Sequence, residues 1–359
     1  MNRDAIARHQ LGVELQHAGS LREAAEAYEE ALSIDPRLEL ARSNLAMVRY
    51  ELGEIDQAIF HLKTLLETHA LNVKARYNLA VIYGAIGQND HAVDQYRQVL
   101  NLESGHAMAL HNLARVFQQQ KRYGEAIGTY ERLLELNPED TNVLFQLGNL
   151  HRLAGDWAQA ETYWRTVTTV DPRHVGALLA MAELCRLRED WDGVLRWALD
   201  ALMVEPENVP ALIQCAKAHL QLLEYSQATD ILYALAEKHP QLAEVRFHLG
   251  SLYHTLGHLA DARAHLEEAV RLDGGRHFEH HNELGSVYYR MGELEAAEAQ
   301  FRAAEEIAPD NAVVKANLGF CYMAMGEREA AAAYFEAFMA RPAASESIKL
   351  SVQCAIDLL

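Results

Sequence analysis

The sequence predicts an all-α protein in which about ten helix hairpins stack into a solenoid. The main observation is a unit of 34 residues that recurs ten times between Ala5 and Ser345 of the 359-residue chain. Most units carry leucine at the seventh place and glycine or alanine at the eighth, and nine of the ten carry alanine at the twentieth. Seven units have a glycine between two helical segments, and six of the 8 prolines follow the second segment.

The first unit illustrates how each helix is predicted. Leu11 and Leu15 lie four residues apart and share one face of a first helix. Gly19 follows, and glycine accepts the left-handed conformation that the chain needs to leave the helix. Tyr28 lies on a second helix, which Pro36 ends because proline cannot continue a helix interior. Small residues at the eighth and twentieth places let the two helices approach closely.

Ten units and one closing helix account for nearly the whole chain. The predicted units are 5–38, 39–72, 73–106, 107–140, 141–174, 175–208, 209–242, 243–277, 278–311 and 312–345. Residues 346–359 are predicted to form a C-terminal capping helix, because Val352 and Ile356 keep the helical spacing. The chain then ends on the apolar pair Leu358-Leu359, so either a partner covers this end or a longer protein continues beyond it.

Two departures from the repeat stand out. The sixth and seventh units have Glu189 and Leu223 where most others have the glycine between helices. Between the eighth and ninth units one extra residue appears in the segment Gly274-Gly275-Arg276-His277, which makes this segment the candidate hinge or sub-boundary.

Composition narrows the function. The formal net charge is −19, with 32 basic and 51 acidic residues, whereas nucleic-acid binding needs a basic surface. No stretch reaches the roughly 18 apolar residues of a membrane span, and residues 1–12 lack the apolar run of a signal peptide. Cys185, Cys215 and Cys321 are predicted to be reduced core residues on first helices, which suits a soluble, cytoplasmic protein.

The 34-residue period, the Leu-Gly or Leu-Ala pair and the recurrent alanine resemble the tetratricopeptide repeat (TPR) family. The resemblance implies a right-handed superhelical solenoid in which the first helices line a concave groove. It also implies a scaffold that binds a protein or an extended peptide in that groove. Catalysis by this chain is not expected, because no nucleophile elbow, P-loop or glycine-rich cradle appears.

Amides recur at the sixth place of the first five units. They are Gln10, Asn44, Asn78, Asn112 and Gln146. An amide both donates and accepts hydrogen bonds, so such a row can hold a peptide backbone with little sequence preference. The row resembles the asparagine ladder in the TPR arm of O-GlcNAc transferases. A purely local role, with each amide bonded inside the repeat, is the alternative.

A basic strip is predicted on the same inner face. Lys74, Arg115, Arg152, Arg186 and Lys217 fall on groove positions of units 3 to 7, against one acid, Glu183. Arginine grips carboxylates through two parallel bonds, so an acidic or C-terminal peptide segment is a natural ligand. Pairing of these cations with neighbouring repeats is the alternative. The predicted peptide-binding residues are Asn44, Tyr77, Asn78, His111, Asn112, Arg115, Phe145, Gln146, Asn149, Arg152, Arg186 and Lys217.

Metal binding and cofactors are not expected, although the chain has 18 histidines. His254 and His258 lie four apart, but Gly257 ends the helix between them. His277, His280 and His281 cluster, yet no carboxylate or cysteine is predicted to complete a ligand set there.

Three functions therefore stay open. The leading prediction is a non-catalytic scaffold that binds protein or peptide partners in its groove. The second is the substrate-recognition arm of a glycosyltransferase whose catalytic domain is absent from this chain. The third is a scaffold that forms homo-oligomers through head-to-tail contacts between repeat ends.

Overall fold

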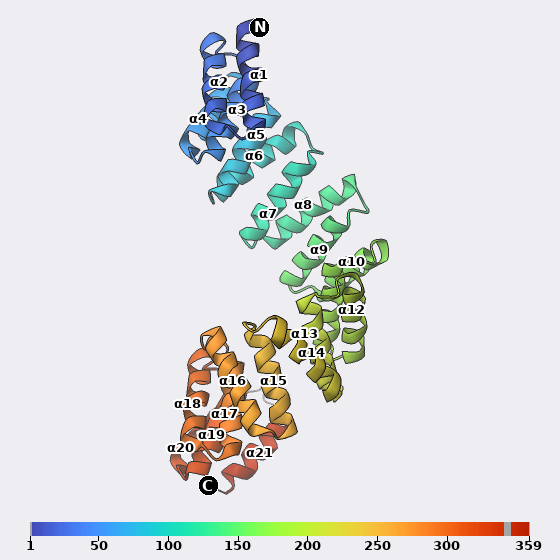
Figure 1. Cartoon of the computed structure of the whole chain (residues 1–359), viewed down its shortest axis with the longest axis vertical. Coiled ribbons are helices and arrows are strands. Elements are labelled where there is room, and N and C mark those ends of the chain that lie inside the picture. Colours follow the sequence, from blue (N-terminus) through green and yellow to red (C-terminus); the bar gives the residue numbers. More distant parts are fainter. Residues whose placement is uncertain (1, 341–345, 359) are drawn as a thin grey trace. The chain divides into compact units, whose positions relative to one another are not determined.

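The computed structural model describes residues 2–340 and 346–358, and within them the regular structure consists of 21 helices with no strand (Figure 1). The predicted all-α solenoid of helix hairpins is confirmed. Contacts divide the helices into two compact units, Met1–Ala177 and Leu178–Leu359. The tail of the tenth predicted unit, residues 341–345, and the terminal Leu359 lie outside the described residues.

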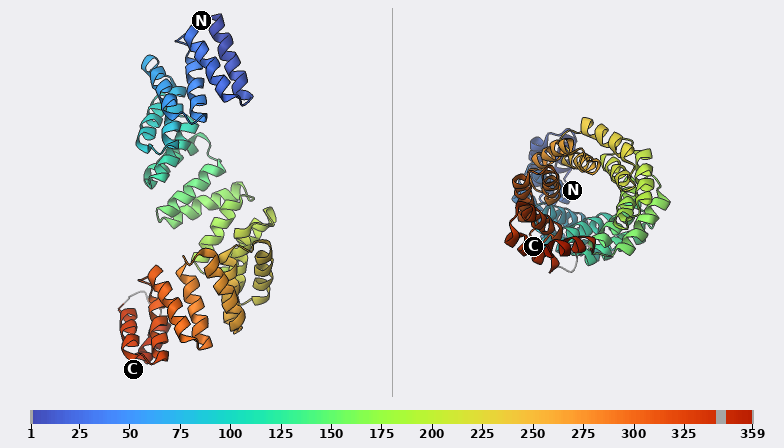
Figure 2. Two further views of the ribbon diagram at one scale, coloured as in Figure 1. Left: turned by 60° about the vertical axis from the view of Figure 1, so that its left-hand side comes forward. Right: turned by 90° about the horizontal axis from the view of Figure 1, so that it is seen from below.

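The first unit contains five helix pairs. Its helices are α1 (Arg3–His17), α2 (Leu21–Ile34), α3 (Glu39–Glu51), α4 (Ile55–Thr68), α5 (Val73–Ala85), α6 (Asn89–Leu102), α7 (Ala107–Gln119), α8 (Tyr123–Leu136), α9 (Thr141–Leu153) and α10 (Trp157–Val170). Each odd-numbered helix packs against the even-numbered helix that follows it, and successive pairs stack on one another (Figure 2). Contacts also join α1 to α3, α3 to α5 and α5 to α7, so the first helices form one continuous side of the stack.

The division between the units falls within α11 (Val175–Leu187). The second unit continues with α12 (Trp191–Val204), α13 (Val209–Gln221), α14 (Tyr225–Lys238), α15 (Ala243–Leu256), α16 (Leu259–Asp273), α17 (Phe278–Met291), α18 (Leu294–Ile307), α19 (Ala312–Met325), α20 (Arg328–Met339) and α21 (Glu346–Ile356). Its odd-numbered helices α13 to α21 touch in sequence along one side. The predicted C-terminal helix is α21, and its Val352 is fully buried.

Five units have glycine at the eighth place, and a ring or branched side chain covers each of these glycines. A Cβ atom added at Gly148 would lie 2.4 Å from Nε1 of Trp164, and one at Gly12 would lie 2.6 Å from the ring of Tyr28. The same close approach recurs for three more glycines and their partners: Gly250 with Leu266, Gly285 with Phe301, and Gly319 with Phe335. The large partner sits sixteen residues after the glycine in each case, on the second helix. The predicted close approach of the two helices is thus confirmed.

The turn between the two helices of a hairpin requires a left-handed residue. Glycine occupies this position in most hairpins, with φ near +80° at Gly19 and Gly257, for example. Lys121, Glu189 and Leu223 take the same conformation, with φ of 58°, 58° and 62°. These three hairpins therefore fold the same way although a side chain makes their turn conformation unfavourable.

Replacing Leu223 by glycine is expected to stabilise the second unit. The left-handed conformation costs a side-chain-bearing residue about 1–2 kcal/mol, glycine loses about 0.5–1 kcal/mol in chain entropy, and Leu223 is 68% exposed, so little packing is lost. Urea unfolding followed by circular dichroism should show the gain. Leu223→Ala is the control, because alanine keeps the unfavourable φ. A Leu223→Gly variant less stable than the parent would mean that the Leu223 side chain contributes packing that outweighs the strain.

The contacts divide the chain after Ala177, and a hinge at Gly274-Gly275 stays a prediction. The segment is held by Asp273, whose Oδ1 accepts from the Gly275 N–H at 2.7 Å.

The predicted core cysteines are confirmed: Cys185, Cys215 and Cys321 are buried free thiols, while Cys354 is exposed. Among the described residues, no helix is long and apolar enough to cross a bilayer.

Candidate functional site

Ten of the twelve predicted peptide-binding residues lie in the first unit, on α3, α5, α7 and α9. The other two, Arg186 and Lys217, lie in the second unit on α11 and α13. Helices α3, α5 and α7 contact one another in sequence, and α9 follows as the first helix of the next hairpin, so the faces that carry these residues form the surface to test.

The amide row of the first unit cross-links neighbouring hairpins. Asn112 donates from Nδ2 to Tyr77 Oη at 3.0 Å, and Asn44 Nδ2 lies 3.2 Å from His9 Nε2. Each bond reaches from the sixth place of one hairpin to the fifth place of the hairpin before it, 35 residues upstream. Asn78 is only 8% exposed and so offers little surface to a ligand. Asn44 and Asn112 thus bond to the preceding hairpin, and not inside their own repeat as the local alternative has it.

Asn112 and Arg115 lie together on a cavity of about 300 Å³. The cavity is formed by α5, α6 and α7, and Tyr96 of α6 contributes to its wall. Burial raises the pKa of Tyr96 above its ordinary value, and the nearby Tyr77 adds to this, so the phenol stays neutral. Sequence reasoning missed Tyr96, because the residue belongs to a second helix. The available signal was a large aromatic residue sixteen places after the small Ala80.

Arg115 also borders a second hollow of about 420 Å³, together with Lys121, Tyr123 and Leu153. Its side chain is exposed, and so is that of Arg152, which directly precedes Leu153 on α9. Neither arginine forms an ion pair with a carboxylate in the part of the chain that the structure describes. Both guanidinium groups are thus available to a ligand.

Rings flank these arginines along the row. Tyr77 stacks on His106 with a centroid separation of 5.2 Å, and Phe145 lies 4.8 Å from the ring of His174. Burial lowers the pKa of His111, and the charge of Arg115 lowers it further, so this imidazole is neutral near pH 7. Gln146 and Asn149 are partly exposed on α9.

In the second unit both predicted cations are already paired. Arg186 forms two hydrogen bonds with Glu183, at 2.8 and 2.6 Å, and Lys217 lies 2.6 Å from Glu244. The nearby His248, at 3.8 Å, and the hydrogen bond from Lys217 lower the pKa of Glu244 to about 2, although burial opposes this. The alternative foreseen from the sequence, pairing with a neighbouring repeat, therefore describes Lys217, whereas Arg186 pairs with an acid on its own helix. These two residues are therefore not part of an unpaired basic strip.

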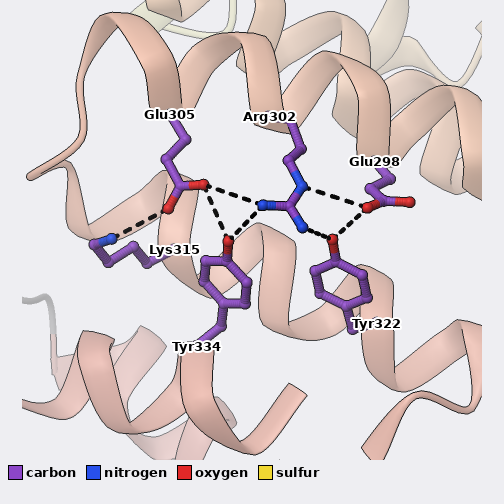
Figure 3. A network of polar contacts seen from close by, with 6 residues as sticks. All are labelled: Glu298, Arg302, Glu305, Lys315, Tyr322 and Tyr334. Carbon is purple, nitrogen blue, oxygen red and sulfur yellow. Dashed lines mark hydrogen bonds and ion pairs between the residues drawn. The ribbon is translucent and has the colours of Figure 1, made fainter. Parts of the chain in front are cut away.

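A larger polar network further along the second unit is also closed on itself. Figure 3 shows the guanidinium of Arg302, on α18, between two carboxylates of the same helix and two phenols, one from α19 and one from α20. Its members are Glu298, Arg302, Glu305, Lys315, Tyr322 and Tyr334. Arg302 donates to Tyr322 Oη at 2.6 Å and to Tyr334 Oη at 3.1 Å, and Lys315 donates to Glu305 at 3.2 Å. These charges fasten three helices to one another and are not offered to a ligand.

The histidine cluster at residues 277–281 differs from the expectation. A carboxylate does complete it: donor atoms of Asp273, His277 and His280 lie within 4.8 Å of one another. Burial opposes ionisation of Asp273, yet hydrogen bonds from His277 and the Gly275 N–H lower its pKa. Sequence reasoning missed Asp273 because one extra residue follows it in the turn before α17. With that irregular length, the repeat spacing does not tell which side chains of the turn come together.

Models of the tetratricopeptide repeat match residues 15–80, 73–106, 109–144, 129–162, 215–276, 249–312 and 288–345, which together cover most of the chain. The chain belongs to the tetratricopeptide repeat family. No curated protein matched the sequence. The TPR assignment makes the chain a repeat scaffold of the protein-interaction type.

Solved structures of similar fold include other TPR proteins. One is the MamA protein, with 20% identity over 48% of this chain and 94% of that chain and a TM-score of 0.45. Another is yeast Tom70, with 14% identity over 98% and 94% and a TM-score of 0.45. A third is YrrB, described as a TPR protein with an unusual peptide-binding site, with 22% identity over 52% and 97% and a TM-score of 0.45.

Proposed function

We propose that the first unit of this TPR scaffold binds an extended acidic segment of a protein partner along α5, α7 and α9. Arg115 and Arg152 are the proposed carboxylate contacts. The observation that carries the proposal is that both are exposed and neither pairs with a carboxylate of the described chain, in a protein with 51 acidic and 32 basic residues. Arg186, by contrast, is held by Glu183 on its own helix.

The surroundings of Arg115 support a peptide rather than a lone anion. The cavity of about 300 Å³ beside it, with Asn112 and Tyr96 in its wall, has room for a side chain next to the bound carboxylate. Asn112 is oriented by its bond to Tyr77. An arginine with five donors can then hold a carboxylate through two bonds while the neighbouring residue enters the cavity.

Titration of a short fluorescent peptide rich in aspartate and glutamate tests the proposal. We expect saturable binding that weakens as salt rises, because exposed charges are screened. Arg115→Gln and Arg152→Gln should each lower the affinity about tenfold, since a hydrogen bond to a charged group contributes about 1.5–3 kcal/mol. The matched peptide with glutamine and asparagine in place of the acids should bind weakly.

Two other arginines provide controls. Arg165 is bonded to Glu161 and Arg186 to Glu183, so Arg165→Gln and Arg186→Gln should leave the affinity unchanged. Equal losses of affinity in all four variants would mean that only the overall charge matters. Arg115 and Arg152 would then not be specific contacts. Equal binding of the acidic and the amide peptide would remove the acidic ligand.

The proposal is of a non-catalytic scaffold in the cytoplasm, which the buried free thiols Cys185, Cys215 and Cys321 favour. The two other functions considered for the sequence are not proposed. The glycosyltransferase arm rested on the amide row, and Asn44 and Asn112 use their amides in contacts with the preceding hairpin. No contact among the described residues points to self-assembly through the repeat ends.

A further inference from the structure

The connection between α16 and α17, in the second unit, gathers three side chains of metal-ligand type. Asp273 is the last residue of α16, and the left-handed Gly274 and Gly275, with φ of 67° and 68°, reverse the chain after it. His277 precedes the first turn of α17 and His280 lies within that turn. This connection is one residue longer than in the regular repeat. Its turn places both imidazoles beside the last residue of α16.

Both ring nitrogens face the same carboxylate oxygen. Asp273 Oδ2 lies 2.8 Å from His277 Nδ1 and 2.6 Å from His280 Nδ1. All three donor atoms lie within 4.8 Å of one another. His277 Nδ1 is hydrogen-bonded to Oδ2 here, and a metal ion that replaced the proton of this bond would meet two nitrogens and one oxygen.

His280 has a buried nitrogen without a hydrogen-bond partner. Its Nδ1 is close to Asp273 Oδ2 but is not aligned for a hydrogen bond with it, and no other described group bonds to that nitrogen. The side chain is only 9% exposed, so water cannot readily take the missing place. An unpaired polar atom at this depth is costly unless something binds it.

The surroundings fix the orientation of the ligands. The Gly275 N–H donates to Asp273 Oδ1 at 2.7 Å, which leaves Oδ2 directed at the histidines. The ring of His280 stacks on Phe247 of α15, with a centroid separation of 4.6 Å and an interplanar angle of 26°. The Asp273 side chain is 5% exposed and that of His277 is 61% exposed. Two ligands are thus held rigidly, while the third opens the site to solvent.

We propose that Asp273, His277 and His280 bind a divalent transition metal ion of the zinc class. Two imidazole nitrogens with one carboxylate oxygen are a donor set that suits zinc and its neighbours rather than calcium or magnesium. Three protein ligands leave a fourth position for water or for a group from a partner. The ion would fasten α17 to the end of α16 at the point where the repeat register changes.

Titration of the chelator-treated full chain with Zn²⁺ by calorimetry, and with Co²⁺ by visible absorption, tests the site. One metal ion per chain should bind, and Co²⁺ should develop the absorption of a low-coordinate complex with nitrogen ligands. Asp273→Asn keeps the size of the side chain and His277→Ala changes an exposed one, so both should fold. Each should lower the affinity more than tenfold, because even losses outside the direct ligands cost 10–100-fold.

His258→Ala is the matched control, because His258 is an exposed histidine of the same unit outside the cluster. Its metal affinity should equal that of the parent chain. Zn²⁺ should also raise the unfolding temperature of the parent and of His258→Ala, but not that of Asp273→Asn. If the parent binds no metal saturably, or if Asp273→Asn and His277→Ala bind it as tightly as the parent, the proposal is overturned. Asp273 would then be a hydrogen-bonding clamp for the turn.

Discussion

Replacing Trp164 by alanine is expected to lower the free energy of unfolding of the first unit by about 3–5 kcal/mol, the usual cost of removing a large buried aromatic side chain. Trp164 is 1% exposed and fills the space that Gly148 leaves on α9. The loss should appear in urea unfolding followed by circular dichroism, because circular dichroism does not depend on the removed fluorophore.

Trp164→Phe is the control for this variant. Phenylalanine occupies the equivalent place at Phe301 and Phe335, each opposite a glycine. The indole Nε1 of Trp164 is buried without a hydrogen-bond partner, so phenylalanine also removes an unsatisfied donor. We therefore expect Trp164→Phe to cost much less than Trp164→Ala. Equal losses would mean that the hairpin depends on the indole itself and not on a ring over a glycine.

Gly148→Leu is expected to be the second most destabilising change, at about 3 kcal/mol. The first added carbon would lie 2.4 Å from Trp164 Nε1 and 2.5 Å from its Cδ1, so α9 and α10 would have to separate. Gly128→Ala on α8 is the matched control, because nothing lies within 4 Å of the added Cβ. That control should gain stability, by about 0.5–1 kcal/mol, since alanine favours a helix more than glycine does.

The same urea measurement can show that the two residues act through each other. Because Trp164→Ala removes the group that Gly148→Leu would strike, the double variant should lose less than the sum of the single losses. Strictly additive losses would contradict direct packing of the ring on the glycine.

The hairpin architecture was predictable because its determinants are local and repeated. A small residue opposite a large one, such as Gly12 with Tyr28, is a constraint that each hairpin must satisfy, so it recurs at a fixed spacing. The left-handed turn was predicted where glycine marks it. At Lys121 and Leu223 the surrounding helices impose the conformation on residues that do not favour it.

The candidate site was less predictable, because contacts between hairpins depend on where a side chain ends and not only on its place in the repeat. The sequence placed Arg115 and Arg186 on equivalent faces, yet only Arg186 has a carboxylate one turn away on its own helix, Glu183. Lys217 reaches Glu244 on another helix. Tyr96 and Asp273 were missed because one belongs to a second helix and the other precedes an irregular turn.

The most direct test of the central claim, that the first unit offers unpaired arginines to an acidic peptide, is a comparison of two double variants. The affinity for the acidic peptide at low salt is measured for Arg115→Gln/Arg152→Gln and for Arg165→Gln/Arg186→Gln, which have the same net charge. Binding should fall by about a hundredfold in the first, from two losses of about tenfold each, and stay at the parent level in the second. Equal affinity of the two double variants would contradict the account.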